Sequence, residues 1–114
     1  MATETPRPPR PGRPVRGSTT GRPIMALFDL IGRRWVLRVI WELDRAPGPL
    51  TFRELRTACG DLSSSVLTRR LSELTEARFV EHEQGYRLTR AGRTLVKRLA
   101  PLTQWAAEWQ NDDG

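Results

Sequence analysis

The sequence contains very few residues of the kinds that form disulfide bonds and metal sites. Cys59 and His82 are the single cysteine and the single histidine among 114 residues. One cysteine excludes a disulfide bond within the chain. A structural zinc site takes four ligands, mostly cysteine and histidine, and the chain offers one of each. We therefore expect neither a bound metal nor a cofactor.

Long apolar runs are also missing. A membrane-spanning helix needs about 18 or more consecutive apolar residues, and a secretory signal needs a shorter apolar core. The chain has neither, so we expect a soluble, cytoplasmic protein without a membrane partner. No nucleophile–base pair, Gly-rich phosphate loop or group of carboxylates stands out, and the sequence does not predict an enzyme.

Basic residues, by contrast, are abundant. The net charge is +6 and the pI is about 11.1, which favours an anionic partner. The charge is unevenly distributed, because residues 1–21 contain four arginines and one glutamate, a net +3. The remaining +3 belongs to the rest of the chain, which is only mildly basic.

The first 22 residues predict a disordered basic tail. They are rich in Pro, Arg and Gly and have almost no apolar surface to bury, which favours a polyproline II character. Arginine recurs at every third position from Arg7 to Arg16, along one edge of such a helix. Two interpretations stay open: an arm that follows phosphates or enters a minor groove, and a tail that solubilises the protein.

Two short apolar helices are expected after this tail. Gly32 would end the first, and the Pro47-Gly48-Pro49 run would follow the second. Apolar residues recur at helical spacing in both segments: Ile24, Leu27, Phe28 and Ile31 within residues 23–31, then Val36, Val39, Ile40 and Leu43 within residues 35–43.

The most informative pattern covers residues 51–74, where two helical segments meet at a tight break. Thr51 and Glu54 have the spacing of a capping box, in which each side chain bonds the backbone N–H of the other residue. Gly60 follows the first segment and suits a helix end that requires a positive φ.

Ser63 fits the N-cap of the second segment, a helix predicted over residues 64–76. One face of this helix is an apolar stripe of Leu67, Leu71 and Leu74, and the opposite face carries Ser65, Thr68, Arg69 and Ser72. A buried stripe behind a polar face is typical of the recognition helix of a helix-turn-helix.

A β-hairpin is expected directly after this helix. Residues 79–84 alternate as a strand does, Gly85 supplies a turn, and residues 86–88 return. Thr89 can cap a further helix, in which Pro101 predicts a kink or a new start.

The predicted fold is therefore mainly α with a small β-hairpin wing (α+β), a winged helix-turn-helix over residues 23–110. Leu50-Thr51 could add a minimal strand before the helix-turn-helix. Residues 111–114 would form a short tail.

Five motifs in this order resemble HxlR-type bacterial transcriptional regulators, which belong to the MarR-like superfamily. The segment that carries them runs from Pro23 to Trp109. The motifs are Leu30-Ile31-Gly32-Arg33-Arg34-Trp35, Phe52-Arg53-Glu54-Leu55, Leu62-Ser63 with Leu67-Thr68, Leu71 and Leu74, Tyr86-x-Leu88-Thr89-x-x-Gly92, and Trp105.

The resemblance implies a homodimer that binds a near-palindromic operator in double-stranded DNA. Three departures from the family pattern stand out. Arg22-Pro23-Ile24 replaces a common Cys-Pro-Val, so a thiol sensor there is not implied. The wing is several residues shorter, and Arg33 replaces the second glycine of the signature Ile-Gly-Gly-Lys-Trp.

The start of the recognition helix offers Ser63, Ser64 and Ser65 for contact with phosphate, beside free backbone N–H groups that favour an anion. Arg69 is the candidate for reading guanine, since arginine can bond O6 and N7 together, and a phosphate contact or a solvated side chain is the alternative. Thr68 could touch a thymine methyl group.

Other basic residues are candidates for contact with the DNA backbone. Arg70 lies nearer the edge of the core and suits a salt bridge or a phosphate contact. The remaining candidates, each of which could equally be an ordinary surface residue, are Arg34, Arg53, Arg56 and Arg87.

Surplus apolar residues in the first and last helices predict the dimer interface that the resemblance implies, the alternative being that the two indoles of the last helix close the core of the monomer. They are Ile24, Leu27, Phe28, Leu102, Trp105 and Trp109. Cys59 lies on an apolar stripe and is expected to be an inert buried residue, and His82 a structural or solvent-facing one.

An alternative function is a winged-helix protein-interaction module with weak or non-specific DNA binding. The short wing and the mild charge of the domain favour it, whereas the residues of the recognition face do not. The sequence identifies no small-molecule effector, no operator and no direction of regulation.

Overall fold

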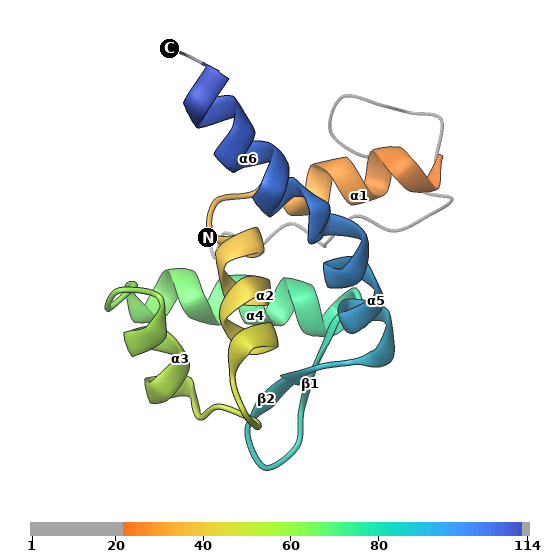
Figure 1. Cartoon of the computed structure of the whole chain (residues 1–114). Helices are drawn as coiled ribbons and strands as arrows, with labels where there is room; N and C mark the ends of the chain where they lie inside the picture. Colours follow the sequence, from red (N-terminus) through yellow and green to blue (C-terminus); the bar gives the residue numbers. More distant parts are fainter. Residues whose placement is uncertain (1–21, 113–114) are drawn as a thin grey trace.

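The computed structural model describes residues 22–112 of the chain. The predictions made for residues 1–21 and 113–114, including the basic arm, lie outside this range. The described elements are α1 (Pro23–Ile31), α2 (Val36–Arg45), α3 (Phe52–Ala58), α4 (Ser64–Glu76), β1 (Val80–His82), β2 (Tyr86–Leu88), α5 (Arg90–Leu99) and α6 (Pro101–Asp112) (Figure 1). A mostly helical chain with one small antiparallel hairpin confirms the predicted winged helix-turn-helix.

The core forms around α2. This helix packs against α3, α4, α5 and β2, and its Val36, Val39 and Ile40 are almost completely buried. Leucines of α3 and α4 meet them, and Val80 and Leu88 of the hairpin close the core. Burial of this apolar surface is the main force that holds the helix-turn-helix and the hairpin together.

The turn between α3 and α4 has the predicted local chemistry. Thr51 Oγ1 accepts from the Glu54 N–H at 3.1 Å, and the Thr51 N–H donates to Glu54 Oε1 at 2.9 Å. The bond from the Thr51 backbone N–H is the main cause of a lowered pKa of the Glu54 carboxyl, and the nearby Thr51 hydroxyl lowers this pKa further. Gly60 has φ 75°, and Ser63 caps α4 by accepting from the Val66 N–H at 3.2 Å. The recognition helix therefore begins and ends where the sequence predicted.

Other boundaries differ from the prediction. Trp35 is not helical: it precedes α2 with a left-handed φ of 74°, a conformation unusual for a bulky residue, and packs against the core. The first strand is shorter than residues 79–84 because Gln84 (φ 53°) and Gly85 (φ 115°) already form the turn. The minimal strand expected at Leu50-Thr51 is a single bridge from Leu50 to Tyr86.

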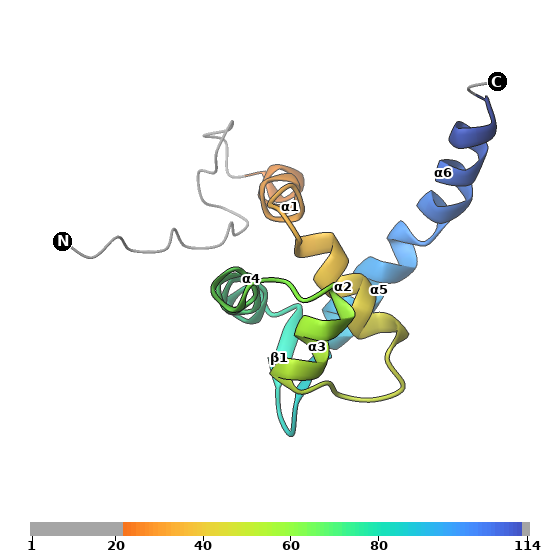
Figure 2. The same ribbon diagram turned by 90° about the vertical axis from the view of Figure 1, so that its left-hand side faces the viewer.

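The last two helices meet at Pro101, where the predicted new helix start is confirmed. α6 runs on to Asp112, past the predicted domain end at residue 110, and none of its 12 residues is buried. Figure 2 shows α6 projecting away from the body formed by α2 to α5. Within the described residues this helix contacts mainly α5, and its apolar side chains are left largely exposed.

Gly92 gives a direct test of how α5 joins the wing. An added Cβ would lie 2.2 Å from the Phe79 carbonyl oxygen, which already accepts from the Thr89 N–H. We expect Gly92→Ala to lower the free energy of unfolding by about 1–3 kcal/mol, measured by urea denaturation. Gly48→Ala is the control, since its Cβ would meet nothing within 4 Å. Equal stability of the two variants would contradict this packing.

Candidate nucleic-acid interface

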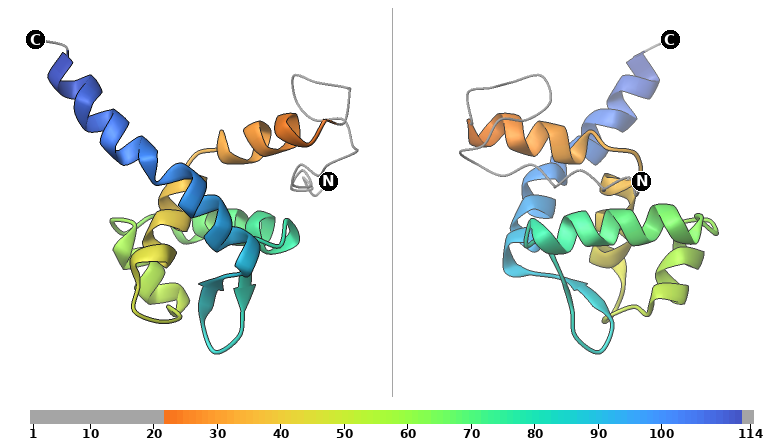
Figure 3. Two further views of the ribbon diagram at one scale, coloured as in Figure 1. Left: turned by 45° about the vertical axis from the view of Figure 1, so that its right-hand side comes forward. Right: turned by 180° about the vertical axis from the view of Figure 1, so that it is seen from behind.

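The recognition helix α4 separates its apolar and polar residues as the sequence predicted. Leu67, Leu71 and Leu74 are buried. We use the term recognition face for the exposed residues Ser64, Ser65, Thr68, Arg69 and Ser72. Seen from behind, α4 lies across the front of the molecule with the hairpin below it (Figure 3, right). The recognition face is therefore exposed within the described part of the chain.

The first turn of α4 suits an anion. Ser63 Oγ is engaged in capping the Val66 N–H and lies 3.3 Å from Ser65 Oγ, while Ser64 is exposed. No acidic residue occupies this turn, so no carboxylate offsets the positive end of the helix dipole. The phosphate contacts expected of the three serines stay a prediction, with Ser63 held mainly by its capping role.

Three of the predicted arginines are exposed and have no partner in residues 22–112. Arg34 lies in the turn before α2, Arg53 on α3 and Arg69 on α4. None of them forms a salt bridge or side-chain hydrogen bond with another described residue. Their guanidinium groups thus need no internal bond to break before they contact a ligand.

The other three predicted arginines already have acceptors. Arg56 Nε donates to the Leu62 carbonyl at 2.7 Å, across the turn of the helix-turn-helix. Arg87 bonds Glu81 at 2.8 Å and Glu83 at 3.4 Å, and Arg70 bonds Glu73 at 2.5 Å. The salt bridge anticipated for Arg70 at the core edge is present. A DNA contact by any of the three stays a prediction and would compete with these bonds.

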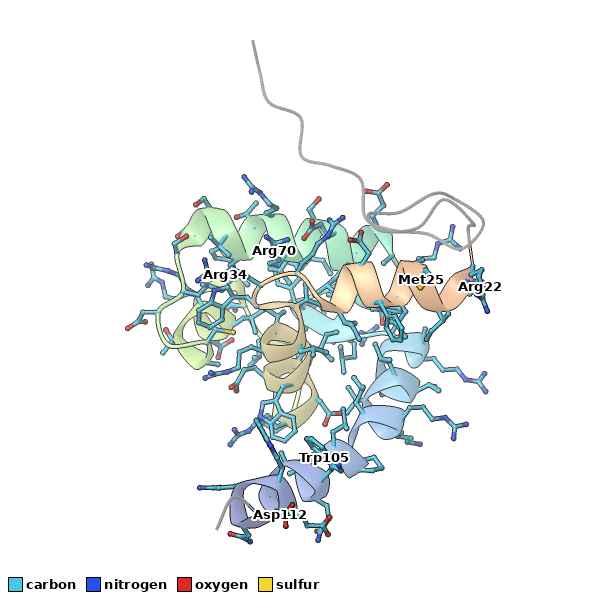
Figure 4. The ribbon with its side chains drawn as sticks, turned by 90° about the horizontal axis from the view of Figure 1, so that it is seen from above. Arg22, Met25, Arg34, Arg70, Trp105 and Asp112 are labelled. Carbon is cyan, nitrogen blue, oxygen red and sulfur yellow. The ribbon has the colours of Figure 1, made fainter. Side chains whose placement is uncertain are left out.

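A buried charged network lies behind the recognition helix, and the sequence did not reveal it. Glu73 is 3% exposed and accepts from both Arg70 and Arg33, and Arg33 also pairs with Asp29 at 3.2 Å. Arg70 of this network is labelled in Figure 4. The i,i+4 and i,i+3 spacings of Asp29–Arg33 and Arg70–Glu73 are visible in the sequence. The Arg33–Glu73 pair joins residues 40 positions apart, and the sequence pattern does not indicate it.

Cys59 and His82 have the surroundings expected of structural residues. Burial raises the pKa of the Cys59 thiol, with an opposing effect from Arg38 and a smaller raising effect from Glu42. His82 is exposed, and its ring stacks on Tyr86 with centroids 4.0 Å apart. Residues 22–112 contain no cluster of three or more His, Cys, Asp or Glu side chains suited to a metal. The described helices are also too short or too polar to cross a membrane.

A large apolar surface is exposed on α1 and α6. Ile24, Phe28 and Leu102 are each about half exposed, and Trp105 and Trp109 more so, at 57% and 66%. The two indoles stack with centroids 5.7 Å apart (Trp105 is labelled in Figure 4). Leu27 is partly buried instead, against a groove between α1 and α5. Leu37 and Trp41 of α2 are further exposed apolar residues that the sequence did not single out.

Known proteins are similar to this chain in sequence and in fold. Residues 30–113 match the family model described as HxlR-like helix-turn-helix. The chain is 32% identical over 89 residues to YvaP, an uncharacterized HTH-type transcriptional regulator of Bacillus subtilis (strain 168), with 71% of this chain and 81% of YvaP covered.

The similar solved structures include two crystal structures from different organisms. One is a possible HxlR family transcriptional factor from Thermoplasma volcanium GSS1, with TM-score 0.67, 26% identity, and 75% of this chain and 82% of that chain covered. The other is quinone-bound YodB from B. subtilis, with TM-score 0.67, 30% identity, and 75% and 94% covered.

The raised pKa of Cys59 leads to a prediction about thiol labelling. At pH 8 the thiolate fraction is lowered and the sulfur is covered, so we expect labelling by Ellman's reagent to be at least roughly tenfold slower in native buffer than in denaturant. Because the pKa is raised, the native rate should still be rising with pH above the ordinary cysteine range. Ser64→Cys in a Cys59→Ala background is the exposed control and should react at once. Equal native rates would contradict a buried thiol.

Proposed function

The chain belongs to the HxlR-like helix-turn-helix family of transcriptional regulators, and from that premise we propose that it is a homodimer that reads a near-palindromic operator in double-stranded DNA through α4. The observation that carries this proposal is the recognition face, a row of small hydroxyls and one free arginine over a buried leucine stripe. Short side chains allow close approach to a major groove, and arginine can identify a base.

Within this proposal the residues of α4 have different roles. Arg69 bonds guanine O6 and N7, and Thr68 contacts a thymine methyl group or a base edge. Ser64 and Ser65 bind phosphate beside the free N–H groups of the first turn. Arg34 and Arg53, which have no internal partner among the described residues, add contacts to the DNA backbone and make binding depend on salt.

The hairpin contributes little to DNA binding in this proposal. Its strands and turn carry Glu81 and Glu83 against Arg87, which is paired with both. Glu83 is largely exposed, so the turn would bring a carboxylate toward the phosphates. Two acidic groups for one neutralised arginine oppose a minor-groove contact. Specificity then depends mainly on α4.

The exposed stripe on α6 supports the homodimer. Helices of 12 residues are only marginally stable in water without packing, and no residue of α6 is buried by the described part of the chain. Leu102, Trp105 and Trp109 share one side of it at helical spacing. We infer that they pack, together with Ile24 and Phe28 of α1, against a second copy. A two-fold dimer would place the two α4 helices about 34 Å apart, in successive major grooves.

A protein-interaction module is the second candidate function. The acidic hairpin and the exposed Leu37 and Trp41 of α2 favour it, because they suit a protein partner better than DNA. Heparin retention across a salt gradient, with and without residues 1–21, separates the candidates. Loss of heparin retention when residues 1–21 are removed would favour the interaction module.

Substitution of Arg69 tests the proposed base contact. On an operator selected from random DNA by the wild type, we expect Arg69→Ala to lose about 1–3 kcal/mol of discrimination at one base pair of each half-site. Fluorescence anisotropy with single-base operator variants gives the measurement. Arg98→Ala, which removes an equal charge from exposed α5, should leave that discrimination unchanged. Uniform weakening on every sequence would instead mean that Arg69 contacts phosphate.

Substitution on α6 tests the dimer. We expect Trp105→Glu to give a monomer in sedimentation equilibrium at micromolar concentration, because it places a charge inside the proposed apolar contact. Ala107→Glu is the matched control: it adds the same charge to the same helix about two residues, or roughly 200°, around the surface. A dimer that survives Trp105→Glu, or dissociates equally with Ala107→Glu, would place the interface elsewhere.

A further inference from the structure

Arg33 connects the α1–α2 turn to the recognition helix from behind. Its guanidinium donates to Glu73 Oε2 through Nη1 and to Asp29 Oδ2 through Nη2, the latter at 3.2 Å. Glu73 Oε1 also accepts a hydrogen bond from Arg70 Nη1 at 2.5 Å. The network therefore contains one carboxylate from α1, one arginine from the turn, and an arginine–glutamate pair from α4.

This charged network (Asp29, Arg33, Arg70 and Glu73) is shielded from solvent and balanced in charge. The two carboxylate side chains are 3–5% exposed and the two arginine side chains 15–16%. Two positive and two negative groups leave no net charge. Arg70 Nε lies buried without a partner among the described residues, so the network also contains one donor whose desolvation is not offset by a hydrogen bond. Buried ion pairs of this kind often add little net stability but specify one geometry.

The geometry that the network specifies is the position of α1 relative to α4. Apart from Ala26 and Leu30, which are buried, α1 is partly or fully exposed, and it packs mainly against α2. In Figure 2, α1 stands above α4 with both helices seen nearly end on. Arg33 bonds carboxylates on both helices at once. A lysine could not do this equally well, because it lacks the planar fork of arginine.

We propose that Arg33 is a positioning residue that fixes α1 against α4 and thereby sets the separation of the two recognition helices in the dimer. This inference rests on the proposed function, in which α1 contributes Ile24 and Phe28 to the dimer contact. If α1 belongs to the interface and α4 enters the groove, the link between them determines which half-site spacing both copies can contact together. Arg33 then acts on specificity without touching DNA.

The experiment compares spacing preference with half-site binding. An operator selected by the wild type is rebuilt with 1 to 4 base pairs added or removed at its centre, and affinity is measured for each duplex and for an isolated half-site. We expect the wild type to prefer one spacing by about tenfold or more, since neighbouring spacings rotate the half-sites away from each other. Arg33→Met should keep half-site affinity and the dimer but reduce this preference to about threefold or less. Arg33→Lys should retain more of it.

Stability is separated from positioning by the matched variant Gly92→Ala. That substitution disturbs the joint between α5 and Phe79 and leaves the charged network intact. At a temperature where both variants are folded, it should preserve the wild-type spacing preference. If Arg33→Met does not fold, the affinity of Arg33→Lys is measured on the same series of operator spacings.

The outcomes distinguish the two proposals. A wild type without sequence preference overturns the proposed function and this inference together. If the wild type binds a specific sequence but Arg33→Met keeps the wild-type spacing preference, only the inference is overturned. The same conclusion follows if Arg33→Met does not fold and a folded Arg33→Lys keeps that preference unchanged. A loss that affects half-sites and all spacings equally, as in Gly92→Ala, also overturns it, because Arg33 would then contribute only to stability.

Discussion

Burial of the leucine stripe of α4 against α2 is the constraint on which the rest of this protein depends. Leu67 and Leu74 are fully buried beside Val39 and Ile40, and this contact fixes which side of α4 faces outward. Because a helix has one orientation once its stripe is buried, the serines, Thr68 and Arg69 are exposed as a consequence. The hairpin and α3 extend the same core. The packing of one face of α4 therefore determines which residues form the candidate site on its other face.

Charge is distributed between two tasks in the described chain. Arg33, Arg56, Arg70 and Arg87 bond internal acceptors and hold the turn of the helix-turn-helix, the network behind α4 and the hairpin. Arg34, Arg53 and Arg69 stay unpaired among residues 22–112. Net charge does not separate these groups, since all seven residues add equally to it. The distinction depends on which carboxylates and carbonyls lie within reach, and this decides how much of the positive charge is available to a polyanion.

Local chemistry made most of the fold predictable from the sequence. The capping box at Thr51, the cap at Ser63, the positive φ of Gly60 and the break at Pro101 all depend on residues within four positions of one another. Contacts between distant segments could not be predicted in this way. Arg33 stands where the family signature has a glycine, and no local pattern links it to its partner Glu73 on another helix.

The candidate site was predictable to a similar extent. Helical periodicity identified the exposed face of α4, because one buried stripe determines the other side. It could not distinguish the free Arg53 from Arg56, three positions along the same helix, which bonds the Leu62 carbonyl. The exposure of every described residue of α6 has a separate consequence. If a second copy covers the apolar side of this helix, its folding becomes a second-order process, and the amount of protein in the cell determines how much of the chain is ordered.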